Sequence, residues 1–366
     1  MIERLYVNNF RCLENFSIDF VGRESALVIG KNGSGKSTMQ QAFAVFQSIC
    51  RGSGRVRDLI AGSDFAYQRK QIPMRFEVGL TLANNRYQYT ISFEMPETFR
   101  EARVADESLT VDGNLIFSRQ LAQVNLTGGS TFGLDWHVVA LPVIHERPGE
   151  SWIQQIKSFF ASMILIAPIP ANITGYSEEE SVELQRDAGN FASWWNAFLS
   201  RYPKAYDVLY KYLQNVFPDL ESFENVPRGE KGKQLLVKFE HKESSQTLSI
   251  DFKQLSDGEK CFFLSALIHA SNQVSGPIFC MWDEPDSHLS LPEIGHFITQ
   301  LRKMTNRNGQ LIVTSHSPAT IRAFSDESTF VFTRKSHLEP TVLRTLADFP
   351  YSGDLVEALV RDEITG

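Results

Sequence analysis

The chain has 366 residues, of which 42% are hydrophobic and 22% are charged, and its formal net charge is −7. These values are those of an ordinary globular protein that can bury a large core, either as one large domain or as two lobes. The net negative charge excludes a global basic field for nucleic acid, so any nucleic-acid site would have to be a local patch.

The N-terminal residues and the apolar runs indicate an intracellular protein without a membrane segment. Residues 1–4 do not have the layout of a signal peptide. The strongest apolar run, residues 159–167, stops at Pro168 and is too short to cross a bilayer. Four scattered cysteines without a C-x-x-C pair argue against a zinc site or a disulfide framework. We therefore expect a soluble, cytoplasmic protein with no membrane partner.

Residues 1–50 read as strand, turn, strand, glycine loop and helix. The loop, residues 30–37, is G-K-N-G-S-G-K-S and matches the phosphate-loop pattern G-x-x-x-x-G-K-[ST]. An apolar run, residues 26–29, precedes the loop, and apolar residues at helical spacing follow it. Because strand, loop and helix are the context that this motif requires, a simple glycine–serine turn is the weaker interpretation.

The residue types of this loop predict its chemistry. Glycines allow backbone N–H groups to close around phosphate oxygens, and the positive end of the following helix points at the same charge. Lys36 would reach the β- and γ-phosphates, and the Ser37 hydroxyl would hold Mg²⁺. We therefore predict that the chain binds a nucleoside triphosphate.

Residues 74–119 change to a period of two, which predicts antiparallel strands. Two turn signals, the Asn-Asn pair at 84–85 and the Asp-Gly-Asn run at 112–114, divide this segment into two hairpins. We expect these strands to form a β subdomain beside the phosphate loop, in an N-terminal lobe of residues 1–120.

Residues 121–234 read as a loop-rich and helical insertion. Glycine and proline punctuate residues 120–150, helical patterns fill residues 151–217, and the acidic run 177–183 is expected to be solvated. An aromatic stripe on the helices fits a core face better than a docking surface. Its members are Trp194, Trp195, Phe198, Leu199, Val208, Leu209, Tyr212 and Leu213.

Residues 235–366 form the predicted C-terminal lobe, in which strands and helices alternate. Three continuous apolar runs, residues 278–282, 311–314 and 330–332, suit parallel strands that are covered on both faces. Each of the first two runs ends in polar residues that can carry chemistry.

Asp283 and Glu284 end the first of these strands. Asp283 at the strand tip would position Mg²⁺, and Glu284 would polarise the water that attacks the γ-phosphate. The same residues could instead form a helix-capping turn. A phosphate loop upstream makes the magnesium site the better interpretation.

Two further segments combine a functional with a purely structural interpretation. Residues 255–260, L-S-D-G-E-K, open an apolar helix, and Ser256 and Glu259 have the spacing of a capping box. The functional alternative is that the Ser256 hydroxyl and the Gly258 backbone meet a γ-phosphate, and both interpretations can hold together. His316 follows the second strand and could hydrogen-bond a γ-phosphate, although a lone surface histidine is otherwise uninformative.

Four elements follow one another along the chain: the phosphate loop, residues 255–260, the Asp283–Glu284 pair and His316. In this chain order they resemble the ABC-type ATPase heads of the RecF, OLD and SMC group, in the small AAA-family branch of bacterial defence and repair systems. Residues 7–11, 187–191 and 217–218 are similar to that group as well. The resemblance implies an α/β fold, a P-loop NTPase of the ABC-ATPase head type. It further implies a mixed sheet, an antiparallel β subdomain and a helical lobe in a single bilobed head over residues 1–366.

The resemblance also implies a role for each site residue, with ATP and Mg²⁺ as cofactors. Glu284, Lys36 and His316 would be catalytic, with Glu284 as the base and His316 as the switch histidine. Ser37 and Asp283 would hold Mg²⁺. The residues expected to contact the nucleotide are Asn32, Gly33, Ser34, Gly35, Lys36, Ser37, Thr38 and Arg11.

A further implication is that Ser256 and Gly258 act in trans on the ATP of a second subunit, in a homodimer or higher oligomer that sandwiches two ATP molecules. One departure from the family pattern concerns the segment after Glu284, where the family often has H-L-H-P and this chain has H-L-S-L-P at residues 288–292. Ser290 and Glu293 have capping spacing, so this loop has a structural interpretation too.

The 50 residues after His316 leave no room for a fused nuclease domain. We therefore expect a switch ATPase that hydrolyses ATP and controls a separate effector, a nuclease or toxin of anti-phage defence being favoured. One alternative is a RecF-like DNA-repair clamp, with nucleic acid bound by a local basic patch. The patch would consist of Arg51, Arg55, Arg57, Arg69 and Lys70. A second alternative is an ATP-binding structural or inhibitory scaffold with little turnover.

Overall fold

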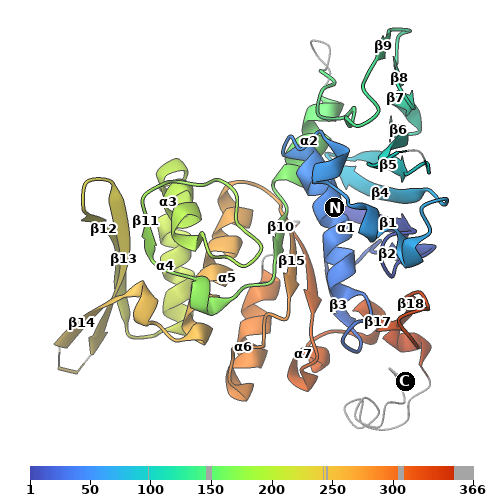
Figure 1. Ribbon diagram of the computed structural model, residues 1–366. Coiled ribbons are helices and arrows are strands. Elements are labelled where there is room, and N and C mark those ends of the chain that lie inside the picture. Colours follow the sequence, from blue (N-terminus) through green and yellow to red (C-terminus); the bar gives the residue numbers. More distant parts are fainter. Residues whose placement is uncertain (98, 146–150, 242, 245, 304–308, 350–366) are drawn as a thin grey trace. The chain divides into compact units, whose positions relative to one another are not determined.

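The computed structural model describes residues 1–97, 99–145, 151–241, 243–244, 246–303 and 309–349 (Figure 1). The chain forms two compact units. Unit 1 consists of Met1–Met163 and Ser325–Gly366, and unit 2 consists of Ile164–Phe324. The three segments predicted from the sequence have their boundaries at residues 120 and 234, and that division stays a prediction. Residues 350–366 of the predicted C-terminal lobe lie outside the described ranges.

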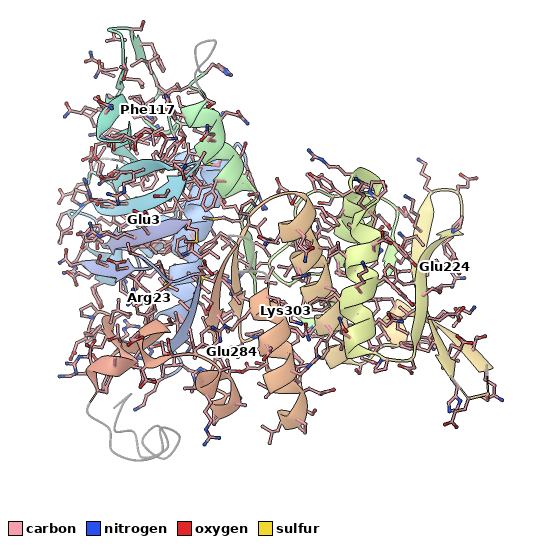
Figure 2. The ribbon with its side chains drawn as sticks, turned by 180° about the vertical axis from the view of Figure 1, so that it is seen from behind. Glu3, Arg23, Phe117, Glu224, Glu284 and Lys303 are labelled. Atoms are coloured by element: carbon pink, nitrogen blue, oxygen red, sulfur yellow. The ribbon has the colours of Figure 1, made fainter. Side chains whose placement is uncertain are left out.

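An eight-stranded antiparallel sheet forms most of unit 1, in the order β2-β1-β4-β5-β6-β7-β8-β9. Its strands are β1 (Ile2–Asn8), β2 (Phe16–Asp19), β4 (Met74–Leu82), β5 (Asn85–Glu94), β6 (Arg103–Val111), β7 (Asn114–Gln120), β8 (Gln123–Leu126) and β9 (Thr131–Gly133). Phe117 of β7 is fully buried and marks the core face of this sheet (Figure 2).

Both predicted hairpins are present. The first turn consists of Ala83 and Asn84, both with positive φ, and Asn85 already begins β5. The second consists of Asp112 and Gly113, again both with positive φ. Two-residue turns with this backbone match the twist of the strands that they join. Strands β8 and β9 lie in the segment 120–150, which was expected to be loop-rich only.

Unit 1 also contains three further strands, β3 (Ser25–Ile29), β17 (Thr329–Thr333) and β18 (Val342–Thr345), and the phosphate loop follows β3. Strand β17 pairs with β3 in parallel and with β18 antiparallel. Helix α1 (Lys36–Cys50) follows the loop, and its apolar face lies between α2 (Trp152–Ala161) and the large sheet. There the Phe46 ring stacks on Phe160 at 5.3 Å and meets Tyr89 edge-on at 5.9 Å. The short 3₁₀ helices of unit 1 are Val56–Asp58, Gly62–Asp64, Ala66–Gln68, Asp326–Ser328 and Leu346–Asp348.

Unit 2 is built around three parallel strands, with β10 and β16 on either side of β15. They are β10 (Ile164–Ile166), β15 (Phe279–Asp283) and β16 (Gln310–Thr314). The helices of this unit are α3 (Phe191–Arg201), α4 (Ala205–Val216), α5 (Asp257–Val274), α6 (Leu291–Arg302) and α7 (Pro318–Arg322), with 3₁₀ turns at Pro170–Asn172 and Phe252–Gln254. Strand β10 lies inside the apolar run 159–167, within a segment that was expected to be helical.

A second, antiparallel sheet of unit 2 was not predicted from the sequence. Strand β13 (Gly232–His241) pairs with β12 (Leu220–Arg228) on one side and with β11 (Tyr176–Ser177) and β14 (Gln246–Asp251) on the other. The aromatic stripe of α3 and α4 packs under this sheet, where Trp195 meets Phe223 at 5.2 Å. The stripe is therefore a core face, as expected. Within the described ranges, no helix is long and apolar enough to cross a membrane.

Candidate functional site

The phosphate loop joins β3 to α1 and is shaped by two glycines. Gly30 has φ 149°, and a Cβ atom there would lie 2.2 Å from the Phe332 carbonyl oxygen of β17. Gly35 has φ 108°, and its Cβ would lie 2.6 Å from the Thr341 hydroxyl oxygen. At both positions an L side chain is disfavoured by contact with β17 or Thr341 and by a positive φ that favours glycine.

The loop presents polar groups that suit a phosphate. Among the described residues, no side chain caps the first turn of α1 and no acidic residue lies in it. The Ser34 hydroxyl is buried and has no hydrogen-bond partner in the described part of the chain. The buried Lys36 ammonium donates to the Gly30 carbonyl at 2.6 Å and to the Lys31 carbonyl at 3.3 Å. An uncapped helix start beside a lysine and an orphaned hydroxyl fits a bound anion.

The other residues predicted to contact the nucleotide belong to this loop or lie beside it in unit 1. Asn32, Gly33 and Ser37 are exposed, and the half-buried Thr38 accepts a hydrogen bond from the Cys12 thiol at 3.5 Å. Arg11 lies in the turn between β1 and β2. Its guanidinium donates to Gln41 of α1 at 2.6 Å and to Asp64 at 2.9 Å. Unit 1 thus brings Arg11 to the helix that follows the loop.

Asp283 is the last residue of β15 in unit 2, and its carboxylate is held from two sides. The Thr314 hydroxyl at the end of β16 donates to Asp283 Oδ1. The Arg186 guanidinium lies 3.6 Å from Asp283 Oδ2. The Asp283 side chain is 12% exposed, so it is largely buried and held in place. Carboxylate oxygen is the ligand type that Mg²⁺ prefers, and Asp283 fits the predicted metal role.

Glu284 follows at the carboxyl end of β15 (Figure 2) and has a left-handed backbone with φ 51°. Its N–H donates to the carbonyl and the hydroxyl of Thr314, at 3.1 and 3.0 Å. This conformation turns the side chain into solvent, where 44% of it is exposed. His316 Nε2 lies 3.5 Å from Glu284 Oε1. The structure therefore brings Asp283, Glu284 and His316 together at the ends of two neighbouring parallel strands.

Sequence reasoning assigned no role to Asp286, which organises this end of the sheet. Its buried carboxylate accepts hydrogen bonds from the hydroxyls of Ser315 and Thr320. The Ser315 hydroxyl in turn accepts from the Ser317 N–H at 2.9 Å. Asp286 thereby fixes the segment that contains His316. The only sequence signal was an extra acidic residue close behind Glu284.

We expect the Asp286→Ala substitution to lower the free energy of unfolding by about 2–4 kcal/mol, because two buried hydroxyls lose a charged acceptor. Urea denaturation would measure the change. Asp286→Asn keeps an acceptor and should lose about half as much. Asp219→Ala, at an exposed position, is the matched control and should change stability by less than about 0.5 kcal/mol. A loss in Asp286→Ala no larger than in this control would contradict the assigned role.

The start of α5 confirms the capping interpretation of Ser256. The Ser256 N–H donates to Glu259 Oε2 at 2.7 Å, and the Ser256 hydroxyl accepts from the Glu259 N–H at 3.3 Å. Gly258 packs against the loop after Glu284, since a Cβ there would lie 3.2 Å from the His288 carbonyl oxygen. Ser290 and Glu293 form a second capping box at the start of α6. A phosphate contact by Ser256 and Gly258 stays a prediction.

Comparison with known proteins places the chain in a family. The model of the RecF/RecN/SMC N-terminal domain matches residues 1–339. The chain belongs to this family. This match confirms the predicted resemblance to RecF and SMC heads. The solved head structures described next confirm the predicted α/β P-loop fold of the ABC type with mixed sheets. Heads of this family are ABC-type ATPases that bind ATP with Mg²⁺.

Two solved structures with this head fold are similar to nearly the whole chain. One is an SMC head bound to the C-terminal winged-helix domain of ScpA, with a TM-score of 0.56, 15% identity, and coverage of 94% of this chain and 98% of that one. The other is an SMC head with an extended coiled coil, bound to the C-terminal domain of ScpA from Pyrococcus furiosus. It has a TM-score of 0.50, 13% identity and 99% coverage of both chains. Among curated proteins, none matches the chain.

Proposed function

We propose that this protein is an ATP-hydrolysing switch that dimerises around ATP and controls a separate effector protein. The observation that supports this function best is the group formed by Asp283, Glu284 and His316. A solvent-facing carboxylate lies 3.5 Å from an imidazole and directly follows a second, fixed carboxylate. Structural capping does not require such a group, whereas hydrolysis of a phosphoanhydride uses a base and a metal ligand. A histidine beside them can in addition hydrogen-bond the γ-phosphate.

In the proposed mechanism, the backbone N–H groups of residues 33–36 and the Lys36 ammonium bind the β- and γ-phosphates. The Ser37 hydroxyl and the Asp283 carboxylate are the groups that would hold Mg²⁺, and the ion would supply neutralisation of negative charge on the phosphate oxygens. Glu284 accepts the proton of the attacking water. His316 donates a hydrogen bond to the γ-phosphate and loses it after hydrolysis. His316 also lies 3.5 Å from the Glu284 carboxylate, so a His316 side chain that has lost the γ-phosphate contact can change the position of the proposed base.

The proposed dimer rests on the N-terminus of α5. Ser256 and Asp257 are exposed there, and the capping box keeps the helix start in place without covering it. The first turn also carries Asp257 and Glu259, and the Glu259 N–H is used by the cap, so the donors proposed for a phosphate bound to another copy are the Ser256 hydroxyl and the Gly258 N–H. Residues 256 and 258 would then contact ATP in trans, and the dimer would open when the γ-phosphate leaves.

We expect ATP to convert the Glu284→Gln protein from monomer to dimer, doubling the mass measured by light scattering. Ser256→Arg in the same background should weaken the dimer at least about tenfold, since a bulky cation replaces the capping hydroxyl at the interface. Ser290→Arg introduces the same side chain at the N-cap position of α6, where the serine hydroxyl donates to the Glu293 carboxylate, and is the control. If ATP leaves the protein monomeric, or if both arginine variants behave alike, the proposed dimer is wrong.

The effector is proposed to be a separate protein. The two similar heads are each bound to a domain of another protein, ScpA, which supports a partner for this head as well. A nuclease or toxin of anti-phage defence remains our favoured effector. Proteins that copurify with ATP-loaded Glu284→Gln, but not with a variant that binds no ATP, would identify it.

The DNA clamp is the less favoured alternative, because part of its basic patch is already engaged by protein groups. The Arg51 guanidinium donates to the Ala161 carbonyl at 3.1 Å. Arg69 lies 2.7 Å from Glu14, and Arg57 lies 3.8 Å from Asp58. These neighbours lower the positive potential that a DNA backbone would need.

A further inference from the structure

The connection between β17 and β18, residues 334–341, lies against the phosphate loop although it is close to the other end of the sequence (Figure 1). We call this segment the strap. Its last residue, Thr341, is buried with 5% exposure. Gly35 of the phosphate loop packs on the Thr341 hydroxyl so closely that no Cβ fits between them.

Thr341 joins two separate parts of the candidate site. Its N–H donates to the Cys12 carbonyl in the turn after β1, at 2.9 Å. Its hydroxyl donates to the Ser34 carbonyl in the phosphate loop, at 2.7 Å. The two residues of the hydrogen bond to Ser34 are 307 positions apart in the sequence, and its donor is the Thr341 hydroxyl.

The direction of the Ser34 carbonyl matters because Ser34 and Gly35 share one peptide plane. In a trans peptide the C=O and the N–H point in opposite directions. A hydroxyl that holds the Ser34 carbonyl on the strap side therefore keeps the Gly35 N–H on the opposite side. That N–H is one of the groups with which the loop would bind phosphate.

Arg334 supports the same loop from the other end of the strap. Its Nη1 donates to the Gly33 carbonyl at 3.4 Å. The rest of the guanidinium binds the strap itself, through the Glu339 carbonyl at 2.7 Å and the His337 carbonyl at 2.6 Å. Arg334 thus ties the strap to itself and contacts the Gly33 carbonyl, while Thr341 contacts the next carbonyl of the loop, that of Ser34.

We propose that Thr341 is a positioning residue for triphosphate binding, which the strap uses to hold the phosphate loop in its binding conformation before ATP arrives. The proposal rests on the proposed ATP site and adds a control to it. Any movement of the strap would change ATP affinity by shifting Gly33, Ser34 and Gly35, the loop residues that it contacts. Preorganisation of this kind removes an ordering cost from binding.

The test uses calorimetric titration of ATP in EDTA, together with hydrogen exchange of residues 33–36 without nucleotide. Thr341→Val keeps the shape of the side chain but removes the donor, and we expect ATP to bind about tenfold more weakly. Loop amides should exchange about tenfold faster. Thr341→Ser keeps the hydroxyl and should stay within about threefold of the wild type. Thr131→Val, at an exposed position of β9, is the control for the substitution itself.

Several results would overturn the proposal: unchanged affinity and exchange in Thr341→Val, an equal loss in Thr341→Ser, or faster exchange throughout unit 1. If Thr341→Val does not fold, the half-buried Arg334 at the start of the strap provides the test instead. Wild-type ATP affinity in Arg334→Gln would then overturn the proposal. Failure of the wild type to bind ATP would refute the proposed function instead. Exchange of the loop amides in the Val and Ser variants would then still decide whether the strap holds the loop.

Discussion

Glu284→Gln is expected to lower the rate of ATP hydrolysis by about 10²- to 10³-fold while ATP affinity stays within about threefold. Glutamine has the shape of glutamate but cannot accept the proton of the attacking water. It retains an oxygen for the hydrogen bond that the Ser287 hydroxyl donates to Glu284 at 3.2 Å, so the loop should keep its conformation. Phosphate release measured at saturating ATP, with a parallel binding titration, would give both numbers.

The matched control is Glu293→Gln, which removes the same charge from a capping box of the same unit. It should leave turnover within about twofold, since a cap contributes to stability rather than to chemistry. Unchanged turnover in Glu284→Gln would show that another group is the base. Turnover near zero already in the wild type, with ATP still bound, would favour the structural or inhibitory scaffold over the switch.

Lys36→Met is expected to weaken ATP binding by about 100-fold. The substitution keeps most of the apolar stem and removes the ammonium, which would make charge-assisted hydrogen bonds to two phosphates. The buried ammonium also holds the Gly30 and Lys31 carbonyls, so the loop loses an internal support at the same time. Binding of ATP in EDTA separates this effect from any change at the metal ligands.

Lys31→Met is the control for Lys36→Met, because Lys31 is an exposed lysine of the same loop and carries the same charge. We expect it to weaken binding by no more than about threefold. Equal losses in the two variants would mean that the loop attracts ATP by its general positive charge, without the specific contact assigned to Lys36. A melting temperature close to that of the wild type would exclude unfolding as the cause of either loss.

The parts of the site that the sequence predicted well are those fixed by short-range spacing. Residues 30–37 need a preceding strand and a following helix, and both are visible as apolar patterns within 20 residues on each side. Ser256 and Glu259 are three residues apart, which is enough to predict their reciprocal hydrogen bonds. The closeness of Glu284 and His316 followed from their positions after two apolar runs. Parallel strands end at the same edge of a sheet, so residues that follow them meet.

The residues that hold the site in place, Thr341 and Asp286, could not be assigned a role because their hydrogen-bond partners are distant in sequence. Thr341 contacts Ser34 across most of the chain, and a single threonine in a polar segment has no pattern that reveals its role. Asp286 could be seen, but its hydroxyl partners could not. The sheet of β11 to β14 was missed for another reason. Leu248 of β14 is 60% exposed, and a strand with so little buried surface lacks the alternation on which strand prediction depends.

The division of unit 1 into two segments has a consequence for synthesis of the chain. Unit 2 is continuous, so it can fold while the ribosome is still translating, whereas unit 1 surrounds it in sequence and waits for β17 and β18. The 307 residues between Ser34 and Thr341 take about 15–60 s to translate at roughly 5–20 residues per second. Throughout that interval the nascent phosphate loop exists without the hydroxyl that later holds it. Until Thr341 has been translated, the loop therefore lacks the contact whose removal in Thr341→Val is expected to weaken ATP binding about tenfold.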